Sequence, residues 1–182
     1  FAWVSEYLES EAPNSPIYQD EVRVDIARYL KASHRSAQIL VAGAGEKFEE
    51  MQLITSVENL PITYLGWRND IGRILSACDI AILCSDNEGI PLTLIQASQA
   101  GLPIISTNVG SVGDIVVNGE TGILTEVNSN SLIRAIDDLL SNPEKMARFG
   151  QAGKERAEGL FSLQEMIDAH ENLYSQVIKR KD

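Results

Sequence analysis

The chain has 182 residues, 44% of them hydrophobic and 23% charged, which is the composition of an ordinary folded domain with room for one full core. Its formal net charge of −11 argues against nucleic acid or an anionic membrane surface as a partner. No apolar run approaches the roughly 20 residues that span a bilayer, and no basic-then-apolar signal pattern opens the chain.

The first two thirds of the chain alternate short apolar runs with amphipathic segments. The apolar runs predict strands at residues 38–42, 62–65, 80–83, 103–107 and 122–125. The amphipathic segments predict helices at residues 21–32, 47–57, 70–77 and 92–100. Strands that are apolar throughout and alternate with helices are typical of a parallel sheet covered on both sides. We therefore predict an α/β fold, a Rossmann-like parallel sheet with helices on both faces.

The last part of the chain, residues 128–182, carries the pattern of a helical tail. Asn130 is placed to cap its first helix, and Asn142, which precedes a proline, is placed to cap the next. Ser162 has capping-box spacing to Glu165 at the start of the last helix. That helix has one apolar stripe, which must pack on something: Leu163, Met166, Ile167, His170, Leu173, Tyr174 and Val177. We expect His170 to lie in a core or at its boundary rather than to bind a ligand.

Residues 1–20 give the weakest signals for secondary structure. They predict a short N-terminal strand and a loop with two prolines. The chain opens on Phe1 rather than methionine, so we expect a piece of a longer protein. Residues 1–182 contain no repeat or low-complexity segment, and we expect a single domain. Cys78 and Cys84 lack metal or redox spacing, which predicts inert thiols in a reducing compartment.

Three glycine-containing turns follow predicted strands. The first contains Gly43 and Gly45, but Phe48 stands where a dinucleotide fingerprint has its third glycine. This turn is either a tight connection or a close approach to a ligand. The third, residues 107–114, has glycines that allow an approach from the other side. Because open α/β sheets bind ligands at the carboxyl ends of their strands, the turns together predict a binding site.

The second turn, residues 85–93, carries the strongest signal for chemistry. Gly89 and Pro91 mark a loop that enters a helix. The free N–H groups of that first turn, above all those of Leu92 and Thr93, carry the positive end of the helix dipole. A pyrophosphate can bind there without a lysine, in spite of the acidic chain.

Two polar side chains flank this helix start. Glu88 either accepts hydrogen bonds from sugar hydroxyls or caps the helix. Gln96, eight residues later, either reaches a ribose hydroxyl or faces solvent. The residues alone leave both choices open.

In order and spacing, these motifs resemble glycosyltransferase family 4, the retaining transferases with the two-domain GT-B fold. The resemblance extends from about Glu21 to Tyr174. It is carried by Gly66-Trp67, Ile71, Leu75, Cys78-Asp79-Ile80, Ser85, Glu88 to Ala97, Gly101 to Ile105, Asn108-Val109-Gly110 and Gly119 to Leu124.

The resemblance implies that this chain is the C-terminal half of such an enzyme and binds a nucleotide-sugar. An N-terminal half would supply the acceptor site and cover part of the apolar stripe, so the chain alone would expose an apolar patch. The implied reaction transfers a hexosyl group, with retention, to a glycan or lipid-linked acceptor. No metal is implied, because backbone amides and basic side chains replace it. The location implied is cytoplasmic, with any contact at the inner membrane face made through the missing half.

By the same resemblance, Glu88 matches the first acid of the family's E-x7-E element and contacts the donor sugar as the catalytic residue. The other implied donor-binding residues lie in the glycine turn, the loop near the base, the backbone that holds sugar and phosphate, and the ribose position. They are Gly43, Gly45, Trp67, Arg68, Gly89, Ile90, Pro91, Leu92, Thr93 and Gln96.

Two positions depart from the family pattern. Gln96 replaces the second glutamate, and residues 1–7 offer neither the arginine nor the lysine that the family places on the donor phosphates. Lys47 and Arg68 are the nearest substitutes. Three alternatives therefore stand beside the transferase: a degenerate domain that only binds or scaffolds, a nucleotide-sugar epimerase, which would need a second acid on the sugar, and an unrelated α/β domain.

Overall fold

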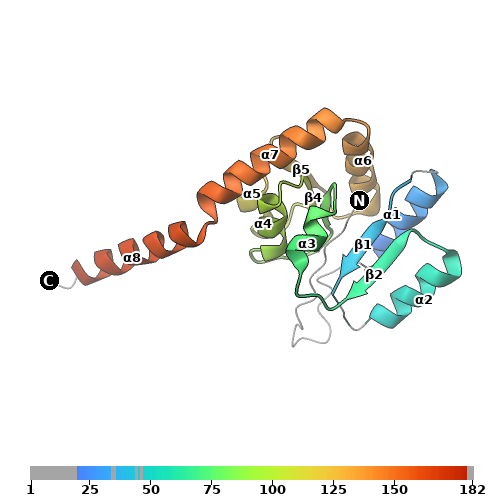
Figure 1. Ribbon diagram of the computed structural model, residues 1–182, viewed down its shortest axis with the longest axis horizontal. Helices are drawn as coiled ribbons and strands as arrows, with labels where there is room; N and C mark the ends of the chain where they lie inside the picture. The colour runs from blue at the N-terminus through green and yellow to red at the C-terminus, as the bar shows by residue number, and fades with distance from the viewer. Residues whose placement is uncertain (1–19, 34–35, 44, 46, 180–182) are drawn as a thin grey trace.

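The computed structural model describes residues 20–33, 36–43, 45 and 47–179 (Figure 1). In this part of the chain, every strand predicted from the sequence is present within one residue of its expected bounds. The strands are β1 (Ile39–Ala42), β2 (Ile62–Gly66), β3 (Ala81–Leu83), β4 (Ile104–Thr107) and β5 (Gly122–Thr125). The four helices expected between them are confirmed with the same accuracy, as α1 (Asp20–Ala32), α2 (Phe48–Glu58), α3 (Ile71–Ser76) and α4 (Leu92–Gln99). A short helix, α5 (Val112–Ile115), is added before β5.

All of the strand pairs described are parallel. β1 pairs with β2, and β4 lies between β3 and β5, so the strands form two hydrogen-bonded groups where the sequence predicted one sheet. The β1–β2 register shifts between Val41 and Ala42, at the carboxyl end of the pair. Parallel strands bring their carboxyl ends to one edge, which is where the glycine-containing turns follow.

The two groups of strands share the same two cores. Successive residues of one strand enter opposite cores: Ile82 and Ile105 contribute to the first, and Leu83 and Ile104 to the second. This is the two-residue period of a strand whose faces are both buried, and it explains why the strands are apolar throughout.

Helices close both cores. The first core is covered by α1, α2 and α6 (Ser129–Leu140), through side chains such as Leu30, Met51 and Ile136. The second is covered by α3, α4 and α5, through side chains such as Leu75 and Leu94. The predicted arrangement, a parallel α/β layer with helices on both faces, is therefore confirmed.

The tail consists of α6, α7 (Pro143–Leu160) and α8 (Leu163–Lys179). The cap expected at Asn130 is wrong: α6 begins at Ser129, and its N-cap is Asn128, whose side-chain oxygen accepts from the Ser131 N–H at 2.8 Å. Asn128 has the extended backbone that an N-cap requires, whereas Asn130 is already helical. The other two caps are confirmed, since Asn142 accepts from Lys145 N–H at 3.0 Å and Ser162 from Glu165 N–H at 3.2 Å.

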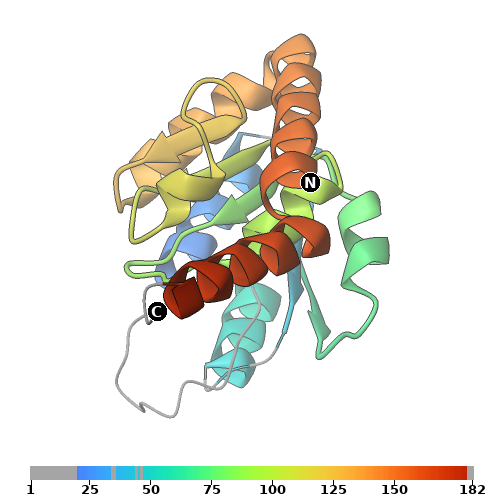
Figure 2. The ribbon, with the colours of Figure 1, turned by 90° about the vertical axis from the view of Figure 1, so that its left-hand side faces the viewer.

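Helix α8 extends from the end of α7 away from the strands (Figure 1), and in the view of Figure 2 it lies in front of the other elements. Every residue from 163 to 178 is exposed, so the apolar stripe packs on nothing in the described chain, and the expected exposed patch is confirmed. The core or boundary position expected for His170 is wrong. Its ring lies in solvent, with Nδ1 2.7 Å from the Met166 carbonyl oxygen one turn earlier.

Candidate functional site

The loops at the carboxyl edge of the strands are joined in two pairs. The loop after β3 contacts the loop after β4: the Thr107 hydroxyl donates to the Ser85 carbonyl oxygen at 2.6 Å, and Ser111 N–H donates to the Gly89 carbonyl oxygen at 3.3 Å. The loops after β1 and β2 are joined by Gly43 N–H, which donates to the Gly66 carbonyl oxygen at 2.8 Å. Three of these four loops are the glycine-containing turns that the sequence analysis had placed at this edge, and the fourth, after β2, is the loop that the resemblance had placed near the base.

A glycine fixes the distance between the β3 and β4 loops. Gly110 has φ of +51°, and a Cβ on it would stand 1.8 Å from the Glu88 carbonyl oxygen. No larger residue fits without moving one of the two backbones. The close approach expected of the third turn thus has a partner in the protein itself, the backbone of Glu88.

Glu88 is half-buried, and its carboxyl Oε1 accepts a hydrogen bond from the Ser85 hydroxyl at 2.5 Å. Burial raises the pKa of Glu88 above its ordinary value, and the Ser85 hydrogen bond acts in the opposite direction. The N-cap of α4 is Pro91, and no side chain caps this helix. Glu88 is therefore not a capping acid, which leaves it available to a ligand at the edge.

The first turn of α4 is open to solvent. Ile90 and Leu92 are each 62% exposed, Gly89 is exposed, Thr93 is half-buried, and Pro91 is buried. The N–H groups of Leu92 and Thr93 stand at positions where no intrahelical acceptor precedes them. Glu88 and this helix start form one continuous segment, so a carboxylate and a set of amides without intrahelical acceptors lie close together in the chain at this edge.

The remaining predicted residues lie on the neighbouring loops and on α4. Trp67 is 69% exposed directly after β2, and Gln96 is exposed on α4. Arg68 forms a two-pronged ion pair with Asp70, with Nε–Oδ1 and Nη2–Oδ2 distances of 2.8 and 2.7 Å. This pair lowers the pKa of Asp70 and engages the guanidinium that the sequence analysis offered as a phosphate ligand.

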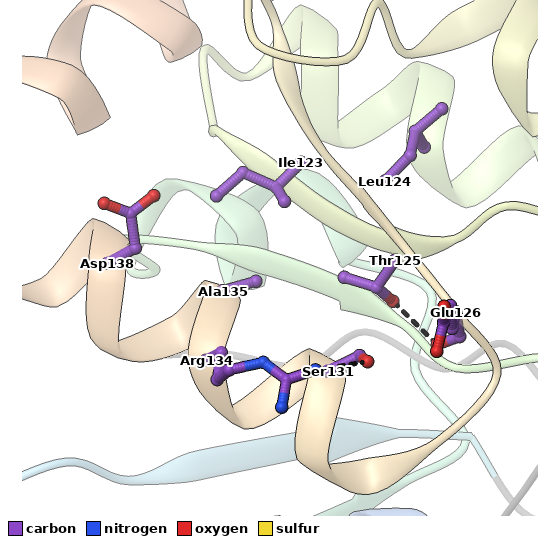
Figure 3. Close-up of a pocket in the computed structure, with 8 residues that line it drawn as sticks. All are labelled: Ile123, Leu124, Thr125, Glu126, Ser131, Arg134, Ala135 and Asp138. Carbon is purple, nitrogen blue, oxygen red and sulfur yellow. Dashed lines mark hydrogen bonds between the residues drawn. The ribbon is translucent and has the colours of Figure 1, made fainter.

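A pocket that the sequence analysis missed lies between β5 and α6 (Figure 3). It is open, has a volume of about 370 Å³, and is lined by Ile123, Leu124, Thr125, Glu126, Ser131, Arg134, Ala135 and Asp138. Asp138 lies at one end and Glu126 at the other, while Arg134 donates to the Ser131 hydroxyl at 3.0 Å. Its charged groups do not converge on one point, and no motif in the sequence marks it.

In the part of the chain that the structure describes, no cluster of three His, Cys, Asp or Glu side chains is arranged to hold a metal ion. The helices described also include none that is both long enough and apolar enough to cross a bilayer.

Solved glycosyltransferases share this fold. The Anabaena protein HepE, solved in complex with UDP and glucose, superposes with a TM-score of 0.80 at 20% identity, covering 96% of this chain and 48% of HepE. The C-terminal domain of a glycosyl transferase group 1 family protein, LpcC, from Francisella tularensis superposes with a TM-score of 0.76 at 18% identity, covering 89% of this chain and 86% of that one. These likenesses confirm the fold as one half of a GT-B structure.

Curated relatives agree with the structural neighbours. N-acetyl-alpha-D-glucosaminyl L-malate synthase from Bacillus anthracis is 28% identical over 149 residues, which is 79% of this chain and 38% of the relative. UDP-Gal:alpha-D-GlcNAc-diphosphoundecaprenol alpha-1,3-galactosyltransferase from Escherichia coli is 30% identical over 150 residues, 78% of this chain and 38% of the relative. The chain thus spans less than half the length of these relatives. The model of the family described as glycosyl transferases group 1 matches residues 21–156, and the chain belongs to that family.

Proposed function

We propose that this chain is the donor-binding half of a retaining hexosyltransferase that takes its sugar from a nucleotide-sugar. The observation that carries the proposal is the segment from Ser85 to Thr93. It presents a carboxylate held by a buried serine directly before a helix start with open amides. A carboxylate suits the hydroxyls of a sugar, and a helix start suits a diphosphate.

Each part of the edge has a role in this proposal. The N–H groups of Leu92 and Thr93, with the helix dipole, stabilise the negative charge that develops on the leaving diphosphate, and no metal ion is required. Glu88 accepts hydrogen bonds from the sugar, and Gln96 from α4 hydrogen-bonds a ribose hydroxyl. Exposed Trp67 offers an aromatic face to the base. The glycines of the first turn, Gly43 and Gly45, let the backbone approach the donor.

The names of the similar proteins support the class of donor and acceptor. HepE was solved with UDP and glucose, and the E. coli relative is named for UDP-Gal and a diphosphoundecaprenol acceptor. Its name also states an alpha linkage, which retention of the α configuration of common UDP-hexoses would give. We therefore propose a UDP-hexose as the donor and a glycan or lipid-linked sugar as the acceptor.

We further propose that an N-terminal half completes the enzyme and covers α8. The chain covers 38% of each of the two curated relatives, and α8 leaves its apolar stripe uncovered. Cys78 and Cys84 are free thiols, which suits a cytoplasmic location.

The experiment that tests donor binding is ligand-observed NMR of the chain with UDP-, GDP- and ADP-glucose. We expect UDP-glucose to bind in preference to the other two, with a several-fold weaker signal in the Glu88→Ala variant. Glu120→Ala is the matched control, because Glu120 is an exposed acid before β5, at the opposite edge of the strands. A folded chain that binds none of the three would contradict the proposal.

One observation favours the degenerate domain as a second candidate. Arg68, a cation at the edge, is already paired with Asp70 and is not free for a phosphate. A degenerate domain would bind nucleotide-sugars weakly or not at all, and the longer protein would show no transfer to an acceptor. Transfer of labelled sugar from the donor identified above, measured in the longer protein, separates the two candidates.

A further inference from the structure

Ser85, two residues after the end of β3, donates the described hydrogen bond to the Glu88 carboxyl. Ser85 is fully buried, and its hydroxyl lies 2.5 Å from Oε1 of Glu88, three residues later. A hydrogen bond to an ionised group away from water is stronger than one on the surface. The bond closes the loop on itself and selects one orientation of the glutamate side chain.

The backbone around this bond is also fixed, from the neighbouring strand. The buried Thr107 hydroxyl donates to the Ser85 carbonyl oxygen at 2.6 Å, which holds the backbone of the serine against β4. Gly110 supports the other end of the loop, because only its missing Cβ lets the β4 loop lie against the Glu88 carbonyl. With both ends held, the Ser85 hydroxyl remains to set the direction of the carboxyl group.

We propose that Ser85 is a positioning residue for Glu88, which fixes the carboxylate as an acceptor for the hydroxyl groups of the donor sugar. The inference rests on the proposed function and assigns a residue that the sequence analysis left without a role. A carboxylate offers about four lone-pair sites, and Ser85 occupies one of them, so Oε2 and the remaining sites stay available to a sugar. Ser85 itself is buried and touches the ligand only through Glu88.

The bond has a second consequence, for the charge of Glu88. Burial raises the pKa of this carboxyl, and the Ser85 hydroxyl lowers it because it donates to the ionised form. Without the hydroxyl, burial acts alone and the carboxyl holds its proton to a higher pH. A protonated carboxyl has lost part of its capacity to accept hydrogen bonds from a sugar.

The bond could also have a purely structural role, because a buried serine hydroxyl needs a hydrogen-bond partner in any fold. The two roles differ in what a Ser85→Ala variant changes. A structural role predicts lower stability and equal losses for every ligand. A positioning role predicts a shift in the titration of Glu88 and a loss confined to ligands that carry the sugar. Ser98→Ala is the matched control, since Ser98 is a buried serine on α4 with no described contact to Glu88.

The experiment uses the 182-residue chain, with carboxyl ¹³C labels on glutamate, assigned with Glu88→Gln. Its first arm titrates Glu88 by NMR without ligand. We expect a higher pKa in Ser85→Ala than in the wild type, and no change in Ser98→Ala. Its second arm measures the affinities of UDP and UDP-glucose by calorimetry. We expect Ser85→Ala to bind UDP-glucose about three- to tenfold more weakly and UDP as before.

An unchanged Glu88 titration in Ser85→Ala overturns the proposal, as does an equal loss for UDP and UDP-glucose. A wild-type chain that binds neither ligand refutes the proposed function instead. In that case the first arm still decides whether Ser85 controls Glu88, because it needs no ligand.

Discussion

Gly110 lies against the Glu88 carbonyl oxygen so closely that a Cβ would stand 1.8 Å from it. The contact joins the loop after β4 to the loop that carries the candidate catalytic residue. Gly110 also has φ of +51°, in the left-handed region where side chains cost energy. Both features make this glycine a requirement of the site as well as of the fold.

We therefore expect Gly110→Ala to lower the free energy of unfolding by about 3 kcal/mol, from backbone strain and overlap together. It should also displace Glu88 and weaken UDP-glucose binding. Urea denaturation measures the first effect and calorimetry the second. Gly89→Ala is the control for stability alone, because a Cβ there meets nothing within 4 Å. If both variants unfold at the same urea concentration, the described contact is not present in solution.

The ionisation of Glu88 gives a second prediction, on stability. A carboxyl whose pKa is higher in the folded than in the unfolded chain binds more protons when folded, so its charge costs stability at neutral pH. Glu88→Gln removes that charge and should raise the melting temperature at neutral pH. The difference should disappear on acidification through the raised pKa, as the wild type becomes neutral too. Scanning calorimetry across this pH range checks it, and a variant less stable than the wild type at neutral pH would argue against the buried charge.

The same titration controls ligand binding. As the pH falls through the raised pKa of Glu88, the carboxylate is lost, and the affinity for UDP-glucose should fall with it. The affinity of Glu88→Gln should be lower at neutral pH and should not follow this titration. Calorimetric titrations at several pH values, with UDP as the ligand that lacks the sugar, make the comparison. A parallel pH dependence for UDP would assign the effect to another group.

Helix α7 gives a fourth prediction, on packing. Gly150 lies against the chain after α4, where a Cβ would stand 2.1 Å from the Gly101 carbonyl oxygen. Gly150→Ala should therefore lower the free energy of unfolding by about 2 kcal/mol, because backbone must move to admit the methyl group. Gly159, in the same helix, has open space around it, and Gly159→Ala should raise the stability by about 0.5 kcal/mol. Opposite signs for the two variants in urea denaturation are the expected result.

The exposure of α8 gives a fifth prediction, on dynamics. Its residues 163–178 are all in solvent, so packing adds little to its stability. Hydrogen exchange of the chain alone should be fast in α8 and slow in α6, where Leu132 and Ile136 are fully buried. In the longer protein, the α8 amides should become protected if the proposed second half covers them. Slow exchange of α8 in the chain alone would contradict its exposed position.

The sequence predicted the strands and the first helices well because both signals are local. Runs such as residues 80–83 are apolar throughout, and helices bounded by glycine or proline are easy to delimit. The wrong cap of α6 shows the limit of such signals. Asn128 and Asn130 are equally good capping residues by type, and backbone conformation, which the sequence does not display, selects Asn128.

Contacts between residues far apart in the chain could not be predicted from the sequence. The glycines after β4 indicated a close approach, but nothing in the pattern named the Glu88 backbone as the partner of Gly110. The apolar stripe of α8 and the resemblance together predicted an exposed patch on the chain alone, and the exposure of that stripe bears this out, but the stripe also suggested a core or boundary position for His170, which is wrong. A signal for Ser85 was present, since it stands three residues before Glu88, the spacing of a capping box. It had no interpretation until both side chains could be placed.

One more consequence follows from the position of α7, the tail helix that contacts both α4 and α5. It packs on α4 and, through Arg156, donates to the carbonyl oxygens of Asp114 and Ile115 at 2.8 and 3.2 Å. The helices that follow the two site loops, α4 and α5, are thus both attached to α7. Helix α8 begins beyond the end of α7, after Phe161 and Ser162. A displacement of α7 would therefore move α4 and α5 together, and with them the two loops that precede these helices.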